Sequence, residues 1–172
     1  LIMSKILIVD DNSEFSETLK TNMEIYLDEI KSNMEVFTIL PFKNKTDYFN
    51  YLQKNDISVL IIDEKLNEKD VNNDGPVDYK GSDLVTFLRS VLNQFPIFCI
   101  TSFTKVEELK SKASEFEGIF NRKDFVLRTD QYAPKIWRAA NNFYSEIFFT
   151  HLFIIHYLSR KKIILGKKTI LS

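Results

Sequence analysis

The sequence predicts an α/β protein built around a parallel sheet. Short apolar runs alternate five times with longer stretches whose apolar residues recur every three or four positions, as in amphipathic helices. Three of the runs, residues 6–9, 59–62 and 97–100, consist of apolar residues alone. Such strands are typical of a sheet that helices cover on both faces. The alternation therefore favours parallel strands joined by right-handed crossovers.

The first half of the chain accounts for three strands and two helices. Asn12 and Ser13 are residue types that cap helices, so the first helix is expected to begin there. Its apolar face and that of the second helix follow a helical spacing. The expected strands are residues 5–11, 34–40 and 58–64. The core-facing residues are Phe15, Leu19, Met23, Tyr26 and Ile30 in the first helix, and Phe49 and Leu52 in the second, which spans residues 46–54.

The second half continues the pattern after a long polar segment. A third helix is expected from Gly81 and Ser82 to just before Pro96, and a fourth over residues 105–116. Strands are expected at residues 96–101 and 118–121. The core-facing residues are Leu84, Phe87, Leu88 and Val91 in the third helix, and Val106, Leu109, Ala113 and Phe116 in the fourth.

Residues 64–80, between the third strand and the third helix, are too long for an ordinary connection and are expected to form an insertion or a lid. The stretch from Asp70 to Gly75 matches the opening of a calcium-binding loop. The twelfth position of that loop is Gly81 instead of glutamate, however, so a solvated turn is the favoured interpretation.

The C-terminal region differs from the rest in charge and in pattern. Residues 131–172 carry seven Lys or Arg side chains and one acid, whereas residues 1–130 carry 16 basic and 23 acidic side chains. Asp130 and Pro134 mark the start of a fifth helix, which is expected to extend past the domain because residues 147–158 are apolar nearly all round. A second copy of the chain or a partner protein is the expected cover for it.

Other uses of this tail have weaker support. Residues 162–171 suggest a small hairpin with a type II′ turn at Gly166. The basic charge permits contact with an anionic membrane or with nucleic acid, but there is no helix-turn-helix pattern, so neither direct DNA binding nor membrane contact is expected. His151 and His156 are five positions apart and do not share a helix face, which excludes them as a metal pair.

Polar residues follow several of the predicted strands. Asp10 and Asp11 follow the first, Asp63 ends the third, Thr101 ends the fourth and Lys123 comes just after the fifth. Because the carboxyl ends of parallel strands meet at one edge, these side chains are expected to converge there. Three carboxylates call for a hard divalent cation such as Mg²⁺. A carboxylate can itself attack phosphorus, and Asp63 is the preferred nucleophile because it stands alone at the end of the central strand.

These motifs resemble the receiver domain of two-component response regulators. The resemblance covers residues 4–145 and implies a flavodoxin-like, doubly wound, five-stranded parallel sheet of order 2-1-3-4-5. Residues 3–145 would then be the receiver domain, with its insertion at residues 64–80, and residues 146–172 a C-terminal extension for dimerisation or partner docking. The matching segments are Ile6–Asn12, Leu60–Asp63, Ile100–Ser102 and Phe120–Phe125.

The resemblance also implies a role for each matching residue. Asp63 would accept phosphate from the phosphohistidine of a sensor histidine kinase or a phosphotransfer protein, in a reaction that requires Mg²⁺. The sequence departs from the family at Asp124, where proline is usual, and in a loop after Asp63 that is about ten residues longer than usual, so that the glycine of the third helix arrives late as Gly81. The implied metal ligands are Asp11 and Asp63 directly, Asp10 through water and Lys65 through its backbone carbonyl; Thr101 and Phe120 would be the switch residues, and Lys123 would pair with the phosphate.

The expected function is therefore that of a stand-alone receiver, a signalling protein and not an enzyme. The lone Cys99, in an apolar run, fits a reducing, cytoplasmic setting. Two alternatives stay open: a receiver-like binding module that works without phosphate, and a Mg²⁺-dependent phosphohydrolase. The phosphohydrolase would need a second acid two residues after Asp63, where this chain has Lys65. In a third interpretation, the acids merely cap the following helices.

Overall fold

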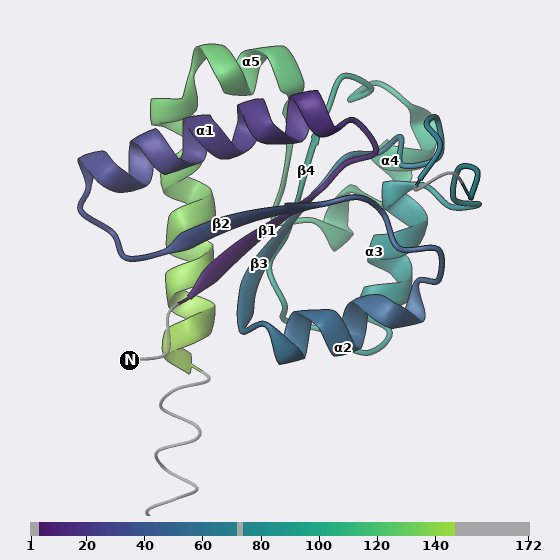
Figure 1. Ribbon diagram of the computed structural model, residues 1–172, viewed down its shortest axis with the longest axis horizontal. Coiled ribbons are helices and arrows are strands. Elements are labelled where there is room, and N and C mark those ends of the chain that lie inside the picture. Colours follow the sequence, from purple (N-terminus) through teal and green to yellow (C-terminus); the bar gives the residue numbers. More distant parts are fainter. Residues whose placement is uncertain (1–3, 72–73, 147–172) are drawn as a thin grey trace, which may run out of the picture.

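The computed structural model describes residues 4–71 and 74–146, which form a five-stranded parallel sheet with helices on both faces (Figure 1). The strand order is β2-β1-β3-β4-β5, which confirms the doubly wound, flavodoxin-like fold predicted above. The strands are β1 (Lys5–Val9), β2 (Glu35–Ile39), β3 (Ile57–Ile62), β4 (Ile97–Thr101) and β5 (Gly118–Asn121).

The register of the two central strands brings their terminal acids together. All six residues of β3 are buried, because helices cover both of its faces, as the apolar run predicts. Val9 of β1 lies opposite Ile62 of β3, and the Asp63 amide donates a hydrogen bond to the Val9 carbonyl (3.1 Å). The next residues along the two strands are Asp10 and Asp63, so they emerge side by side.

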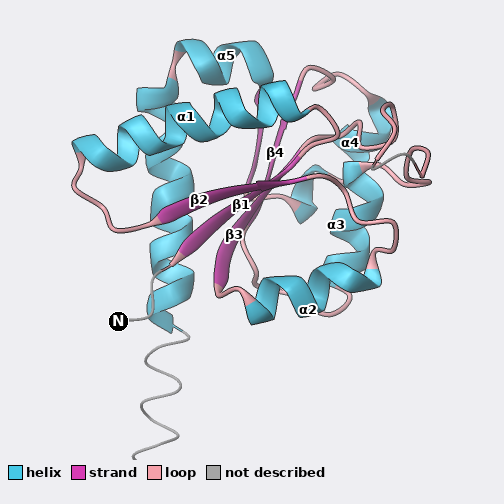
Figure 2. Cartoon of the chain, in the orientation of Figure 1, coloured by secondary structure: helices cyan, strands magenta, loops and turns pink. Residues whose placement is uncertain are grey.

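The helices form two layers (Figure 2). One layer contains α1 (Ser13–Glu29), α5 (Arg122–Leu127) and a helix over residues 129–146. The other contains α2 (Thr46–Lys54), α3 (Gly81–Arg89) and the short α4 (Glu107–Ser111), which a 3₁₀ turn follows at Ala113–Glu115. Each layer buries its own apolar core against the sheet.

The core on the α1 side joins segments far apart in sequence. Leu19, Met23 and Leu27 of α1 are buried there together with Ala133, Ile136 and Ala140 of the last helix. The small alanines sit every seven residues and allow that helix to pack closely. Asp130 and Pro134 indicated its start correctly, since it begins at residue 129, whereas the separate helix α5 before it was not expected.

Two predicted helices are shorter than expected, and the reason is local. The third helix ends at Arg89, whose guanidinium donates to the carbonyls of Leu92 and Phe95 and so holds the chain as it turns back. Val91, expected in the core, is consequently 53% exposed. The fourth helix gives way to the 3₁₀ turn, which leaves Ala113 exposed while Phe116 is buried.

Two further core assignments were wrong by small shifts in position. Tyr48 is the fully buried aromatic of α2, and Phe49, the expected one, is only partly buried. Ile30 follows the last turn of α1 as its C-cap and is largely exposed. In α2 the helical spacing did not determine which of two neighbouring residues faces the sheet, whereas in α1 the helix ends before Ile30.

The insertion, residues 64–80, packs onto the domain through buried apolar residues. The Tyr79 hydroxyl donates to the Phe42 carbonyl, and the Phe42 amide donates to the Tyr48 hydroxyl (3.1 Å). The two tyrosine hydroxyls are 3.1 Å apart, which completes a hydrogen-bonded chain. The buried apolar residues of the insertion are Leu66, Val71, Val77 and Tyr79.

Several predictions fall on residues outside the described part of the chain. These are the apolar helix of residues 147–158, the hairpin of residues 162–171 and the centre of the calcium-like loop at residues 72 and 73. The division into a domain of residues 3–145 and an extension stays a prediction for the same reason. Within residues 4–71 and 74–146, no helix has the length and apolar character needed to cross a membrane.

Candidate functional site

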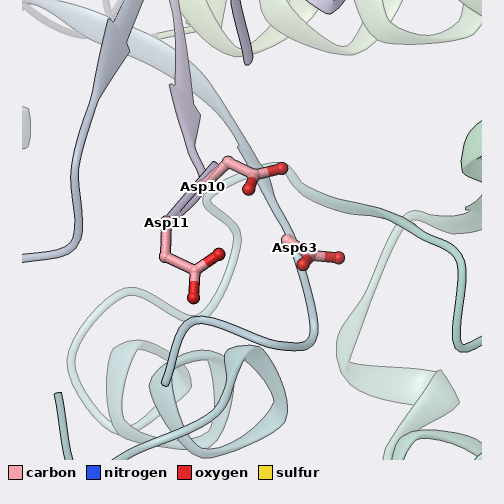
Figure 3. A group of neighbouring side chains, drawn as sticks. All are labelled: Asp10, Asp11 and Asp63. Atoms are coloured by element: carbon pink, nitrogen blue, oxygen red, sulfur yellow. The ribbon is translucent and has the colours of Figure 1, made fainter. Parts of the chain in front are cut away.

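Three carboxylates meet at the carboxyl ends of β1 and β3 (Figure 3). Asp10 and Asp11 follow β1, Asp63 follows β3, and one oxygen of each lies within 4.8 Å of the others. All three side chains are buried, with exposures of 2% for Asp10, 7% for Asp11 and 4% for Asp63. The convergence expected of the three acids is therefore present, whereas Lys123, expected beside them, is exposed.

Helix α3 is docked directly on the backbone that carries Asp63. The Gly81 amide donates to the Glu64 carbonyl (2.9 Å), and a Cβ at Gly81 would come within 2.2 Å of the Asp63 carbonyl oxygen. The buried Glu64 carboxylate accepts from the amide and the hydroxyl of Ser82 (2.8 and 2.9 Å). A larger residue at position 81 would collide with the Asp63 carbonyl oxygen. This explains why a glycine begins α3, directly after the insertion.

An arginine that sequence reasoning did not single out lies between two of the acids. Arg122 donates through Nη2 to Asp10 Oδ2 (2.6 Å), and the same nitrogen lies 3.1 Å from Asp63 Oδ2. Its guanidinium is 3.6 Å from the centre of the Phe15 ring, on the first turn of α1. The Arg122 side chain is 18% exposed, so the acid cluster and its cation are closed off together.

The start of α5 decides which basic residue enters the site. The Asn121 side chain accepts hydrogen bonds from the Lys123 and Asp124 amides and thereby caps the helix, so Arg122 is its first residue. Arg122 turns toward the acids, and Lys123 is exposed. Asparagine followed three residues later by an acid is a recognisable N-cap signal and would have pointed to this arrangement.

The two expected switch residues lie on the neighbouring strands. Thr101 ends β4 and is fully buried, and its hydroxyl accepts a hydrogen bond from the Phe103 amide (3.2 Å). Phe120 of β5 packs inward, with its ring centre 5.8 Å from that of Phe98 and 4.7 Å from that of Tyr132. The structure thus places both side chains inside the domain, on strands β4 and β5.

The insertion reaches the site through Asp11. The amides of Glu68 and Lys69 both donate to Asp11 Oδ2, at 2.9 and 2.8 Å. Lys65 forms an ion pair with Glu68, and its ammonium lies 4.2 Å from the centre of the Phe103 ring. The insertion therefore covers one of the three acids and is held at its near end by Lys65.

Burial makes the ionised form of the acids costly. It is the main reason that the pKa of Asp10 is raised from 3.8 to about 7, with neighbouring Asp63 adding to the effect and Arg122 opposing it. The pKa of Asp63 is raised by burial as well, and Arg122 again opposes the shift. A positive charge bound at this point would lower the cost of ionising Asp10 and Asp63.

The donor set fits a hard divalent cation. Carboxylate oxygens are the ligands that Mg²⁺ prefers, and it is bound in proteins by one or two carboxylates with water and substrate oxygens completing the shell. Asp63 Oδ1 is buried and has no hydrogen-bond partner among the described residues. An unpartnered carboxylate oxygen at this point is a free ligand atom or a free nucleophile.

Solved structures of receiver domains are similar to this chain. A response regulator receiver domain protein from Clostridium thermocellum is 17% identical, with 86% of this chain and 99% of that chain covered at a TM-score of 0.51. The response regulator TrrA from Thermotoga maritima, solved in complex with Mg²⁺-BeF, is also 17% identical and covers 77% and 99% of the two chains at a TM-score of 0.52. The receiver domain of a putative Luxo repressor protein from Vibrio parahaemolyticus is 15% identical, covers 81% and 95%, and has a TM-score of 0.56.

The chain therefore has the fold of response regulator receiver domains, as its motifs predict. No protein-family model and no curated protein matches the sequence. At these identities the likeness concerns the fold, and the chemistry rests on this chain's own residues.

Proposed function

We propose that this chain is a stand-alone response regulator receiver whose Asp63 accepts a phosphoryl group in a Mg²⁺-dependent reaction. The observation that carries the proposal is the buried group of Asp10, Asp11 and Asp63, whose oxygens lie within 4.8 Å at the carboxyl ends of two adjacent strands. Thr101 stands at the end of the next strand. This is where open α/β sheets bind their ligands.

The chemistry is an exchange of one bond to phosphorus for another. The free oxygen of Asp63, Oδ1, attacks the phosphorus and forms an O–P bond, while the bond from phosphorus to the donor's imidazole nitrogen breaks. The nitrogen leaves with the electron pair. The carboxylate attacks in its ionised form, so no general base is needed at this step once Asp63 has lost its proton.

The metal would be held by the residues that the sequence pointed to. Asp11 and Asp63 would bind Mg²⁺ directly, Asp10 through water, and Lys65 through its backbone carbonyl. When bound, Mg²⁺ supplies positive charge that neutralises the phosphoryl oxygens. The response regulator TrrA, which shares this fold, was solved in complex with Mg²⁺-BeF, and this supports a Mg²⁺ site in the present chain.

Phosphorylation would change the protein's contacts with its partners. Thr101 would follow the phosphoryl group, Lys123 would pair with it, and Phe120 would pass the change to the surface around β4 and β5. The donor would be a sensor histidine kinase or a phosphotransfer protein in the cytoplasm. Residues 146–172 would serve as a dimerisation or docking segment, and output would come through protein contacts and not through DNA binding or a catalysed reaction.

The first test is the intact mass of the chain after incubation with acetyl phosphate and Mg²⁺. One added phosphoryl group, about 80 Da, is expected for the native chain and not for Asp63→Asn, because only the carboxylate can form the acyl phosphate. Asp124→Asn is the matched control, since Asp124 is an exposed acid at the same end of the sheet, and it should be labelled like the native chain. Equal labelling of the native chain and Asp63→Asn would reject Asp63 as the acceptor.

One observation favours a second candidate, the binding module that works without phosphate. Arg122 already pairs with Asp10 and Asp63, so the acid cluster has a counter-cation of its own. Labelling distinguishes the two functions, because the module would gain no mass under conditions that label a known receiver.

A further inference from the structure

We propose that Arg122 is a built-in counter-cation of the acid cluster, which Mg²⁺ has to displace before Asp63 can be phosphorylated. This inference rests on the proposed phosphoacceptor function and concerns its regulation. The geometry behind it is the position of Arg122 Nη2, which is 2.6 Å from Asp10 Oδ2 and 3.1 Å from Asp63 Oδ2. One positive group thus bridges two of the three acids to which a divalent cation would bind.

The bridge lies in a buried part of the site. The two carboxylates are 2% and 4% exposed, so water screens their attraction to Arg122 far less than it screens a surface ion pair. Arginine suits this position, because its planar guanidinium does not lose its charge and is more weakly hydrated than an ammonium. Leaving the acids without this cation would expose two buried like charges to each other.

The fold holds Arg122 in this place from two sides. The Phe15 ring lies 3.6 Å from the guanidinium, a favourable cation–π distance, and comes from the first turn of α1. The Asn121 cap fixes the start of α5 and with it the direction in which Arg122 leaves the backbone. The Phe15 ring and the Asn121 cap thus both hold the guanidinium in place, which distinguishes Arg122 from a long surface side chain that touches an acid by chance.

The third acid is also satisfied without a metal. Asp11 Oδ2 accepts hydrogen bonds from the Glu68 and Lys69 amides of the insertion. Among the described residues, Asp63 Oδ1 is the carboxylate oxygen of this cluster that is both buried and without a partner. All three acids are therefore already in contact with Arg122 or with the amides of the insertion.

Arg122 and Mg²⁺ cannot both neutralise Asp10 and Asp63. The two cations would lie beside the same carboxylates a few ångströms apart, and their mutual repulsion there is large because little water screens it. Mg²⁺ binding therefore includes the cost of moving the guanidinium away. The consequence is a receiver that requires more Mg²⁺, or a partner that displaces Arg122, before it accepts phosphate.

Calorimetric titration with MgCl₂ tests the competition. Arg122→Gln is expected to bind Mg²⁺ at least about tenfold more tightly than the native chain, since a unit charge within a few ångströms is removed. Arg128→Gln is the matched control, because it makes the same change in charge at an exposed position at the far end of α5. It should change the affinity by less than about threefold, as expected for a screened surface charge.

A second variant keeps the test independent of the folding of Arg122→Gln. Phe15→Leu leaves the charge in place but removes the ring beneath it, and should tighten Mg²⁺ binding by a smaller factor than Arg122→Gln does. Equal Mg²⁺ affinity for the native chain, Arg122→Gln and Arg128→Gln would overturn the inference. Failure of all variants to bind Mg²⁺ would overturn it too, because removal of a competitor should reveal the site.

A double-mutant cycle without metal examines the ion pair itself. Unfolding in urea with EDTA is compared for the native chain, Arg122→Gln, Asp10→Asn and the double variant. Loss of the ion pair should appear as a coupling of at least about tenfold in the unfolding equilibrium constant. Additive effects would mean that Arg122 is not the counter-cation.

Labelling with acetyl phosphate over a Mg²⁺ series separates this inference from the proposed function. The inference predicts that Arg122→Gln is labelled at lower Mg²⁺ than the native chain, and labelling of both at the same concentration contradicts it. Mg²⁺ binding by both chains without labelling of either would instead reject the phosphoacceptor function.

Discussion

The Asp63 carbonyl oxygen occupies the space that a side chain at Gly81 would need. A Cβ there would lie 2.2 Å from that oxygen and 3.1 Å from the Glu64 Cα, both backbone atoms. The first residue of α3 is thus packed against the residue proposed to accept phosphate, although 18 positions separate them in sequence. The end of the insertion and the end of β3 form one rigid unit at this point.

Gly81→Ala is expected to destabilise the domain by about 2–3 kcal/mol, the usual cost of forcing an atom into a packed site. It should also weaken Mg²⁺ binding, because the backbone around Asp63 has to shift. Urea unfolding and calorimetric titration measure the two effects.

Gly75→Ala is the comparison for that variant. Gly75 has a positive φ of 71° but no atom within 4 Å of a Cβ, so its replacement adds strain without a clash. We expect a loss of about 1 kcal/mol, typical of a strained φ, and unchanged Mg²⁺ binding. Similar Mg²⁺ affinities for the Gly81→Ala and native chains would show that α3 does not position Asp63.

Stability of the metal-free protein should depend on pH through Asp10. Burial raises its pKa from 3.8 to about 7. Below about pH 4 the carboxyl is protonated in both the folded and the unfolded chain and costs nothing. Between about pH 4 and 7 the unfolded chain ionises while the folded chain keeps the proton, so the folded state loses stability as the pH rises.

The measurable quantity is the free energy of unfolding of Asp10→Asn minus that of the native chain. It should rise from pH 4 to pH 7 by at most about 4 kcal/mol, because each pKa unit corresponds to about 1.4 kcal/mol. Mg²⁺ should reduce this difference at pH 7, since it binds the ionised form. The same comparison for Asp124→Asn, an exposed acid, should be nearly flat. A flat profile for Asp10→Asn would contradict the raised pKa.

The sequence alone predicts the residues of the site that directly follow strands. Apolar runs locate β1 and β3, and a parallel register brings the residues after them together, so Asp10, Asp11 and Asp63 follow from the pattern alone. The resemblance marked Gly81 as the glycine of the third helix, but the close approach that requires it became visible only in the structure. These features depend on order along the chain and on sheet geometry.

Features decided by a one-residue difference on a helix were not predictable in the same way. Arg122 and Lys123 are adjacent in sequence but point about 100° apart on a helix, so the position of the cap at Asn121 decides which one meets the acids. Tyr48 and Phe49 present the same ambiguity in α2. The anchoring of the insertion by tyrosine hydroxyls depends on hydrogen bonds between residues some thirty positions apart, for which a periodic pattern gives no signal.

Tyr79→Phe should loosen the insertion. The hydroxyl that it removes donates to the Phe42 carbonyl and lies 3.1 Å from the Tyr48 hydroxyl, so two buried polar groups lose a partner. We expect a loss of about 1–3 kcal/mol in the free energy of unfolding, as for other unsatisfied buried groups. Faster amide exchange in residues 64–71 should accompany it.

Tyr51→Phe is the matched control, since Tyr51 is a partly buried tyrosine of the same helix α2 that contacts the Phe42 ring edge-on. Its effect should stay within about 0.5 kcal/mol, as for substitutions away from a buried network. Equal losses for the two variants would mean that the hydroxyl chain does not hold the insertion.

Asp11→Ala should separate the insertion from the acid cluster. The carboxylate accepts from the Glu68 and Lys69 amides at 2.9 and 2.8 Å, and hydrogen bonds to a charged acceptor are worth about 1.5–3 kcal/mol each. Hydrogen exchange at these two amides should therefore speed up by at least about tenfold, because 1.4 kcal/mol corresponds to a factor of ten.

Asp10→Asn, which removes a charge from the same cluster but no partner of the insertion, should leave the two rates unchanged. If both variants accelerate exchange equally, the insertion responds to the charge of the cluster as a whole. If only Asp11→Ala does, this carboxylate alone links the insertion to the site. Binding of Mg²⁺ by Asp11 would then directly change the hydrogen bonds that hold residues 64–80.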